Sequence, residues 1–429
     1  MSSMNEKAFI HVEACELRSL DTQKIEKYLI KNGYQIVDYP ENADIIILVT
    51  CAFSEAKAKN ALNNVKKYQK YNAKLIVAGC LPEINGEELS KIFNGKTIST
   101  KDLDKNPKKF EEIFPNITER FEYISDCNNL YENLGKDNLK DCITTFIKKA
   151  PFLEKLYHSF REFFLRLFFY EHSTLYLLKS RTLFLIRVAW GCKGNCSYCA
   201  ITNAIGKLHS KPLDQCLQEF KDGLNKGYKK FILTADDVGA YGEDIQSDFP
   251  SLLDRMTSVE GDYRILVLGL HPRYAVKYAD DIERLLKRKK IVSLNIPIQS
   301  GNHRILKLMH RYSDTEKMKE TFLRFRKSDP DIALETDIIL GFPTQTFQEL
   351  KKTLNFIEEI GFNSGLIYPF SSRPGTVAEN IEPKITPEEI TRRVNYSKKF
   401  LKKLGYRIIF SPQEQFIMFD RESKVGRII

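Results

Sequence analysis

Three cysteines in the middle of the chain have the spacing of a metal-cluster loop. Cys192, Cys196 and Cys199 lie in the segment GCKGNCSYC, directly after an apolar strand expected over 182–189. Three thiolates in such a CxxxCxxC loop can hold three irons of a 4Fe–4S cluster and leave the fourth iron open for a further ligand. A zinc knuckle is the alternative, but the segment lacks the second pair of cysteines or histidines that closes a zinc site.

Three further cysteines lie near the N-terminus. Cys15, Cys51 and Cys80 each come directly after an apolar segment of strand length. Helical segments separate these strands, which predicts βαβ crossovers and a parallel sheet. The carboxyl ends of parallel strands share one edge of the sheet, so we expect the three thiols to converge there. The pattern therefore predicts a second metal site, although cysteine is also a common buried residue.

Several chemistries are open to this second group of cysteines. Zinc requires a fourth ligand, and no histidine recurs at an equivalent place, so an iron–sulfur cluster with one exchangeable iron fits better. A dinucleotide is disfavoured because the turn after the first strand, CELRS, has no glycine-rich phosphate cradle. Cobalamin is disfavoured because His11 lies inside the first expected strand and not in a loop.

Length and composition indicate a globular protein. The 429 residues, 42% hydrophobic and 28% charged, predict two or three domains. No signal peptide opens the chain and no apolar run reaches about 18 residues, so we expect a cytoplasmic protein without a transmembrane helix. In that compartment clustered thiols indicate metal ligands more than disulfides. The net charge of +10 suits RNA, although a lysine-rich solvated surface explains it equally well.

Over nearly its whole length the chain resembles the methylthiotransferase family of radical S-adenosylmethionine (SAM) enzymes. Besides the two cysteine groups, the segments that carry the resemblance are ILTADDVGAYGED (232–244), LNIPIQSGNHRILKLMHR (294–311), ETDIILGFPTQT (335–346) and SSRPGT (371–376). The resemblance implies an α/β fold with an N-terminal parallel-sheet three-cysteine domain and a radical SAM partial (β/α)6 barrel. The alternation of strands and helices from 182 to 405 agrees with such a barrel.

This resemblance also predicts the domain boundaries. We expect the N-terminal auxiliary-cluster domain over 1–115, a linker over 116–180 and the radical SAM core over 181–411. An incomplete TRAM-like segment, related to a small RNA-binding β-barrel, is expected over 412–429. Within the linker, 151–170 has an aromatic stripe at helical spacing, which indicates a core or interdomain contact. The alternative is a helix that contacts a membrane surface or a partner.

The resemblance implies a reaction and its cofactors. The family inserts a methylthio group at an unactivated C–H position. The six cysteines would then hold two 4Fe–4S clusters, and two SAM molecules would be used per turnover. An electron donor of the flavodoxin or ferredoxin type would supply electrons.

Residues outside the cysteine groups are expected to contact SAM or substrate. The resemblance places Tyr198 near the adenine of SAM. Polar residues at the ends of barrel strands are further candidates for SAM contacts; these are Asp236, Asp237, Gln299 and Asp337. Their alternative roles are helix capping and turn formation. Arg373 is expected either to face the substrate or to be a satisfied surface arginine.

The substrate is the least determined part of the prediction. GKLHSKPLD (206–214) looks most like the branch that acts on threonylcarbamoyladenosine in tRNA. The alternatives are β-methylthiolation of a protein or peptide residue, which the incomplete TRAM-like end favours, and a non-catalytic iron–sulfur scaffold or sensor. The chain also departs from the usual glycine–cysteine–x–x–asparagine context, because Ala14 precedes Cys15 and Arg18 replaces the asparagine.

Overall fold

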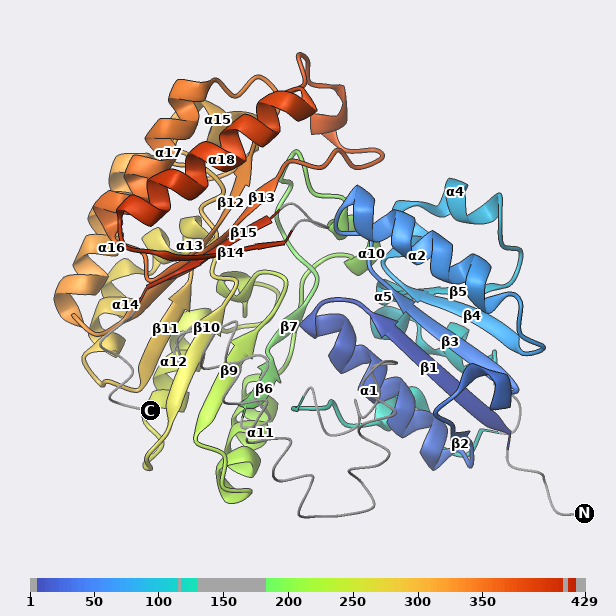
Figure 1. The fold of residues 1–429 in the computed structure, drawn as a ribbon. Helices are drawn as coiled ribbons and strands as arrows, with labels where there is room; N and C mark the ends of the chain where they lie inside the picture. The colour runs from blue at the N-terminus through green and yellow to red at the C-terminus, as the bar shows by residue number, and fades with distance from the viewer. Residues whose placement is uncertain (1–5, 115–116, 130–182, 412–415, 422–429) are drawn as a thin grey trace, which may run out of the picture.

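The computed structural model describes most of the chain as two sheets with their helices. The described residues are 6–114, 117–129, 183–411 and 416–421. Figure 1 shows the N-terminal sheet, coloured blue, beside the larger sheet of the core, coloured green to red. Most of the expected linker, including the aromatic segment 151–170, lies outside the described residues.

The N-terminal domain contains a five-stranded parallel sheet of order β2-β1-β3-β4-β5. Its strands are β1 (Lys7–Glu13), β2 (Gln35–Ile36), β3 (Ile45–Thr50), β4 (Lys74–Gly79) and β5 (Lys96–Ser99). The strand β3 is buried along its whole length, as expected for a parallel strand that helices cover on both faces. The predicted N-terminal α/β sheet is therefore confirmed.

Helices pack on both faces of this sheet and form two apolar clusters. One face is covered by α1 (Glu16–Lys31), α5 (Thr100–Lys105) and α6 (Pro107–Glu111). The other face is covered by α2 (Glu55–Tyr68), α3 (Leu81–Ile84), α4 (Gly86–Ser90) and α10 (Ile201–Ile205). The helix α10 follows the second cysteine group, so the core domain contributes directly to the N-terminal hydrophobic core.

The core domain is an eight-stranded sheet of order β14-β15-β13-β12-β11-β10-β9-β6. Six of its strands are parallel: β6 (Leu183–Arg187), β9 (Lys230–Thr234), β10 (Arg264–Leu268), β11 (Ile291–Asn295), β12 (Ala333–Leu340) and β13 (Ser364–Pro369). A short hairpin of β7 (Ala189–Trp190) and β8 (His209–Ser210) flanks the second cysteine group. The predicted (β/α)6 arrangement is confirmed.

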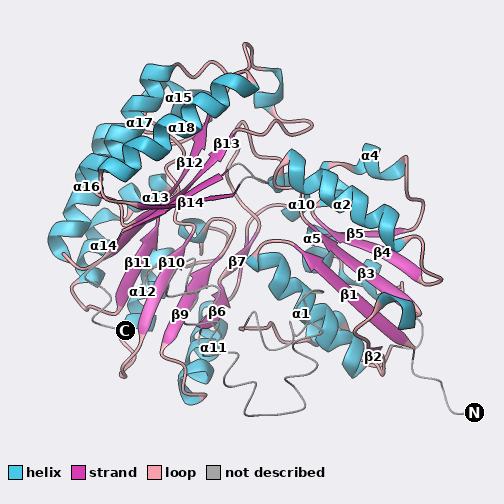
Figure 2. Cartoon of the chain, in the orientation of Figure 1, coloured by secondary structure: helices cyan, strands magenta, loops and turns pink. Residues whose placement is uncertain are grey.

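Helices cover the outer face of the core sheet (Figure 2). They are α11 (Leu213–Asn225), α12 (Phe249–Thr257), α13 (Pro272–Lys277), α14 (Ala279–Leu286), α15 (His303–Leu308), α16 (Thr315–Ser328), α17 (Phe347–Ile360) and α18 (Pro387–Lys403). Four short 3-10 helices lie in connections: η1 (Pro40–Asn42), η2 (Phe121–Tyr123), η3 (Val238–Ala240) and η4 (Val377–Asn380). The largest apolar cluster fills the space between the sheet and these helices.

The C-terminal strands extend the core sheet. The strand β15 (Phe416–Asp420) pairs antiparallel with β13, and β14 (Arg407–Ser411) pairs antiparallel with β15. The described part of the expected TRAM-like segment is therefore continuous with the core sheet. Backbone pairing with β13 satisfies the hydrogen-bonding groups of a strand pair that is not stable by itself.

The inner face of the core sheet packs against the N-terminal domain. Leu17 and Leu20 of α1 join an apolar cluster with Leu183 and Leu185 of β6 and with Met418 of β15. One helix of the first domain thereby fixes the position of its cysteine edge against the core barrel. Among the described residues, no helix has the length and apolar character needed to cross a membrane.

Candidate functional site

The N-terminal cysteines follow strands that end level with one another. Thr50 of β3 pairs with Glu13 of β1 on one side and with Gly79 of β4 on the other. The thiols that follow these strands are close enough to affect one another's ionisation; they are Cys15, Cys51 and Cys80. The strands therefore bring the three thiols together at one edge of the sheet.

Gly79 allows the chain to approach β3 closely just before Cys80. Its φ of +98° lies in the left-handed region, and a Cβ atom there would lie 2.4 Å from the Thr50 carbonyl oxygen. The backbone N–H of Cys80 donates to that same oxygen at 3.1 Å. A larger residue at position 79 would push the Cys80 backbone away from β3.

Two of these thiols are buried and have raised pKa values in the metal-free chain. Cys15 is exposed, whereas Cys51 and Cys80 are buried. Burial raises the pKa of both buried thiols to about 11. The backbone N–H of Phe53 donates to Cys51 Sγ at 3.4 Å and offsets part of that effect. The thiols are therefore protonated near neutral pH until a metal displaces the proton.

The second cysteine group is a loop wrapped closely around its own sulfur atoms. The backbone N–H of Gly194 donates to Cys192 Sγ at 3.1 Å. A Cβ atom on Gly194 would lie 3.2 Å from Cys192 Sγ and 3.8 Å from Cys196 Sγ. Burial raises the pKa of Cys199 to about 11. A glycine between the first two cysteines leaves the space beside the sulfur atoms free of side chains.

The donor set of each group fits an iron–sulfur cluster better than a single zinc ion. Within the described part of the chain, no three His, Cys, Asp or Glu side chains are arranged to hold one metal ion. Zinc draws its thiolates to about 2.3 Å from one point. A 4Fe–4S cluster instead binds each thiolate through a different iron and so spreads its ligands. Two sets of three thiols fit two such clusters, each with one open iron.

A cavity of about 550 Å³ lies between the two domains and is lined by Cys199 and by residues that directly follow Cys15 and Cys51. From the N-terminal domain it is lined by Glu16, which follows Cys15, and by residues 52–57, which follow Cys51. From the core domain it is lined by Cys199 and by the ends of β11, β12 and β13. The cavity also includes several predicted contact residues, namely Tyr198, Gln299, Asp337 and Arg373. A molecule in this cavity would lie beside both cysteine groups.

Gln299 and Asp337 form one corner of the cavity wall. Gln299 has a φ of 66°, and its backbone N–H donates to the Asp337 carbonyl oxygen at 2.8 Å. The Asn295 amide lies 3.5 Å from Asp337 Oδ2. Burial raises the pKa of the Asp337 carboxyl group to about 6. This corner therefore presents an amide and a carboxyl group that changes its charge near neutral pH.

Asp236 and Asp237 lie behind the second cysteine loop and do not line the cavity. Asp236 accepts a hydrogen bond from the Gly191 backbone at 3.2 Å, one residue before Cys192. Asp237 is 3% exposed and pairs with Arg273 at 3.3 Å. Burial raises the pKa of both carboxyl groups, that of Asp237 to about 6. In this structure Asp236 supports the start of the cysteine loop, whereas Asp237 is held by Arg273.

Arg373 is buried at the interface between the domains. Only 4% of the residue is exposed, so the surface-arginine interpretation is wrong. Its Nη2 donates to Asn85 Oδ1 of the N-terminal domain at 2.5 Å, while Nε has no hydrogen-bond partner. One side of the guanidinium thus holds the domains together, and the residue also forms part of the cavity wall.

Arg311 is a site residue that the sequence interpretation overlooked. Its Nη1 lies 3.2 Å from the Tyr198 hydroxyl and 3.6 Å from Cys196 Sγ, and its Nη2 donates to the Pro297 carbonyl oxygen. The residue closes the segment LNIPIQSGNHRILKLMHR, so a signal was present in its motif. The contact itself joins residues 115 positions apart and required the fold to be seen.

Two domain families match this chain. Residues 186–357 match the radical SAM superfamily, and residues 7–99 match a family described as Uncharacterized protein family UPF0004. The first match covers the second cysteine group and the core strands up to β12, and the second covers the N-terminal sheet with the first group.

Curated relatives cover most of the chain. A protein named ribosomal protein uS12 methylthiotransferase RimO, from Thermotoga maritima, is 29% identical over 90% of this chain and 80% of its own length. A probable threonylcarbamoyladenosine tRNA methylthiotransferase from Pyrococcus horikoshii is 27% identical over 87% and 78%. A tRNA-2-methylthio-N(6)-dimethylallyladenosine synthase from Thermodesulfovibrio yellowstonii is 29% identical over 89% and 79%. The chain therefore combines a radical SAM domain with a UPF0004 domain and is homologous over most of its length to radical SAM methylthiotransferases.

Solved structures support the fold of this chain. The radical S-adenosylmethionine methyltransferase TsrM from Kitasatospora setae, solved with cobalamin and a 4Fe–4S cluster, matches with a TM-score of 0.56 at 10% identity. The match covers 97% of this chain and 88% of TsrM. At this identity the likeness concerns the fold alone. His11, the histidine considered above as a ligand for cobalamin, lies in the strand β1 and not in a loop, with its ring 5.3 Å from that of Tyr68.

Proposed function

We propose that this methylthiotransferase acts on a modified adenosine in tRNA, of the threonylcarbamoyladenosine type, and that it holds two 4Fe–4S clusters. One observation carries the proposal: the same cavity is lined by Cys199 of the second cysteine group and by the residues that directly follow Cys15 and Cys51 of the first. Transfer of a sulfur group to an unreactive C–H position requires a hydrogen-abstracting centre and a sulfur-donating centre at one target atom. Placing both beside a single cavity replaces an encounter between separate molecules with a fixed geometry.

The two cysteine groups would have different roles on the two sides of the cavity. Cys192, Cys196 and Cys199 would hold the cluster that binds SAM, and Cys15, Cys51 and Cys80 would hold the auxiliary cluster. When bound, these groups supply reductive cleavage of SAM and a source of sulfur. An electron donor of the flavodoxin or ferredoxin type would deliver the electrons.

The remaining wall residues would bind and orient the reactants. Tyr198, fixed by Arg311, offers an aromatic surface beside Cys199. Gln299, in the loop after β11, and Asp337, within β12, offer polar groups to SAM from the cavity wall. Arg373 would orient the substrate while its bond to Asn85 keeps the domains together. Their shared cavity is apolar over most of its wall, which favours exclusion of water.

A nucleoside substrate is favoured by charge and by aromatic exposure. The net charge of +10 suits a polyanion. Phe53 lines the cavity with 55% of its surface exposed, and its ring lies 5.6 Å from that of Tyr368 in an edge-on arrangement. Exposed aromatic rings beside a cavity are the usual stacking surfaces for unpaired bases.

A second candidate substrate is a ribosomal protein. The observation that favours it is that relatives at 29% identity are named methylthiotransferases of ribosomal protein uS12. These relatives span as much of the chain as those named for tRNA. The two substrates are therefore tested side by side.

The test begins with anaerobic purification and reconstitution of three proteins. They are the wild type, a variant with Cys192, Cys196 and Cys199 changed to alanine, and a variant with Cys15, Cys51 and Cys80 changed to alanine. We expect about eight irons per chain in the wild type and about four in each variant. About four irons in the wild type and none in the first variant would contradict a cluster at the N-terminal cysteines.

The reconstituted proteins are then incubated with SAM and a reductant, and either with tRNA or with ribosomal protein uS12. Mass spectrometry of nucleosides and of peptides identifies the product. We expect methylthio-threonylcarbamoyladenosine from the wild type and no methylthiolated product from either variant. Methylthiolation of the protein alone would show the second candidate to be correct. Cleavage of SAM without transfer to either molecule would contradict both.

A further inference from the structure

Arg18 is a buried cation beside the N-terminal cysteines. It lies on the first turn of α1, three residues after Cys15, and its side chain is 3% exposed. Its positive charge favours the thiolate form of both Cys15 and Cys80. The usual family pattern has asparagine at this position, which offers a hydrogen-bond donor without a charge. This chain therefore carries a charged donor at the edge where the three thiols meet.

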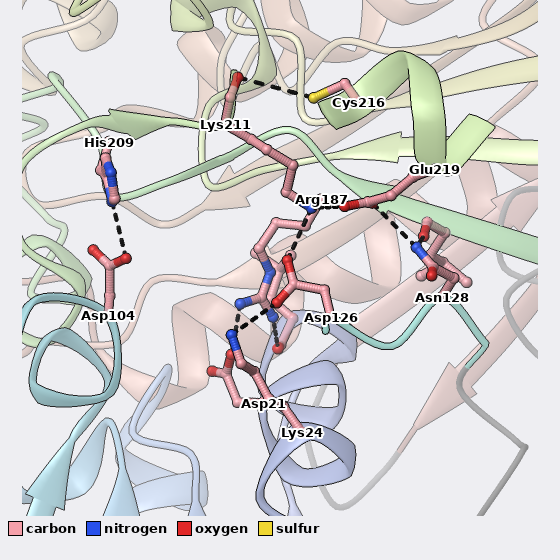
Figure 3. A network of polar contacts seen from close by, with 12 residues as sticks. Asp21, Lys24, Asp104, Asp126, Asn128, Arg187, His209, Lys211, Cys216 and Glu219 are labelled. Atoms are coloured by element: carbon pink, nitrogen blue, oxygen red, sulfur yellow. Dashed lines mark hydrogen bonds and ion pairs between the residues drawn. The ribbon is translucent and has the colours of Figure 1, made fainter. Parts of the chain in front are cut away.

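The guanidinium of Arg18 is anchored on one side and unsatisfied on the other. Its Nε lies 3.0 Å from Asp21 Oδ2, close enough for an ion pair. The same carboxylate pairs with Arg187 of β6 at 2.6 Å (Figure 3). It is therefore shared between two guanidinium groups. On the other side, Nη1 of Arg18 has no hydrogen-bond partner. A buried unpaired donor costs about 1–3 kcal/mol, so this group favours an anionic acceptor nearby.

Asp236 has a carboxyl group that interacts with Arg18 and with both cysteine groups. Its carboxylate acts electrostatically on Arg18 and disfavours the thiolates of Cys80 and Cys199, one from each cysteine group. An ionised Asp236 would therefore disfavour negative charge at both cysteine groups, and the positive charge of Arg18 offsets it.

We infer that Arg18 is a positioning residue that donates hydrogen bonds to a sulfur atom of the cluster held by Cys15, Cys51 and Cys80, and that its charge raises the reduction potential of that cluster. Net charge and hydrogen bonds to sulfur set the potentials of iron–sulfur clusters. The inference rests on the proposed function in one respect, namely that these cysteines hold a cluster.

The test uses the full chain with only the N-terminal cluster present. The background protein has Cys192, Cys196 and Cys199 changed to alanine, is purified anaerobically and is reconstituted with iron and sulfide. Arg18→Gln and Arg18→Lys are compared in this background. The matched control is Arg393→Gln, because Arg393 is also buried, at 4% exposure, but pairs with Glu389 and Gln345 away from the cysteines. Iron content and the midpoint potential, followed by electron paramagnetic resonance, are measured for each.

We expect Arg18→Gln to retain its iron and to have a more negative potential. The expected change is at least tenfold in the one-electron reduction equilibrium, which corresponds to about 59 mV. Arg18→Lys should shift less, because it keeps the charge but loses the planar fork of donors. Arg393→Gln should leave the potential at the background value.

Two results would overturn the inference. An unchanged potential in Arg18→Gln would mean that Arg18 only packs. Loss of iron from both Arg18 variants, with cooperative unfolding preserved, would show a structural requirement and not an effect of charge. If Arg18→Gln alone loses iron and Arg18→Lys keeps it, the charge is required and the inference stands. Absence of iron from the background protein is a separate result, because it overturns the proposed function itself.

Discussion

Asp21 and Arg187 form a buried ion pair that joins the two domains, with 2.6 Å between Oδ1 and Nη1 (Figure 3). Their side chains are 9% and 6% exposed. Arg187 also donates to the Leu17 carbonyl oxygen and lies 5.4 Å above the ring of Trp190. The pair therefore fixes α1, and with it Cys15, against the first strand of the core sheet.

Replacing Asp21 with alanine should destabilise the protein by about 3–5 kcal/mol. The change leaves the guanidinium groups of Arg187 and Arg18 buried without their shared carboxylate, and breaking a buried pair has this typical cost. Denaturant unfolding of the metal-free chain measures it. The control is Glu320→Ala, which removes an exposed ion pair with Lys317 and should cost less than about 1 kcal/mol. Equal effects of the two changes would contradict a stabilising role for the buried pair.

Arg311→Gln should impair SAM cleavage while leaving iron binding intact. The change removes a charged donor 3.2 Å from the Tyr198 hydroxyl and 3.6 Å from Cys196 Sγ. Hydrogen bonds to charged groups contribute about 1.5–3 kcal/mol, so we expect a loss of about tenfold or more in the cleavage rate. The control is Arg304→Gln on the same segment, whose exposed side chain pairs with Glu349. Wild-type rates of deoxyadenosine formation in Arg311→Gln would show that Arg311 does not support this site.

The sequence was sufficient for the parts of the site that depend on local pattern. Strand periodicity and the parallel topology place Cys15, Cys51 and Cys80 at one edge, and the level ends of β1, β3 and β4 agree with this expectation. The exact start of α1 at Glu16 was not predictable, because Cys15 occupies the N-cap position without a side-chain capping bond. Cysteine gives no capping signal in a sequence.

The parts that were missed depend on tertiary contacts. The burial of Arg18 arises from packing of α1 against β6, and the contact of Arg311 with Cys196 joins distant segments. The placement of β15 was also beyond local pattern. An alternating apolar strand pairs with any free edge, and only the assembled sheet shows that this edge is β13.

Asp337 should make the stability of the metal-free chain depend on pH. Burial raises the pKa of its carboxyl group from 3.8 to about 6, so the folded state binds the proton more tightly than the unfolded state. Stability is therefore lost as the pH rises from about 4 to about 6, by up to about 2–3 kcal/mol. Asp337→Asn should remove this part of the pH dependence in denaturant unfolding. The exposed Asp280→Asn serves as the control, and identical pH profiles for Asp337→Asn and wild type would contradict the prediction.

Phe53→Ala should weaken binding of tRNA without affecting the fold. The ring lines the cavity, is 55% exposed and contacts Tyr368 edge-on, so its removal takes away a stacking surface and little buried area. Stacking of a base on an aromatic ring contributes about 1–3 kcal/mol, which predicts about a tenfold or greater rise in Kd by filter binding. Tyr39→Ala is the control, because Tyr39 is 45% exposed but does not line the cavity. If Phe53→Ala binds tRNA normally and instead loses activity on ribosomal protein, the nucleoside proposal is wrong, and the same ring contacts a peptide.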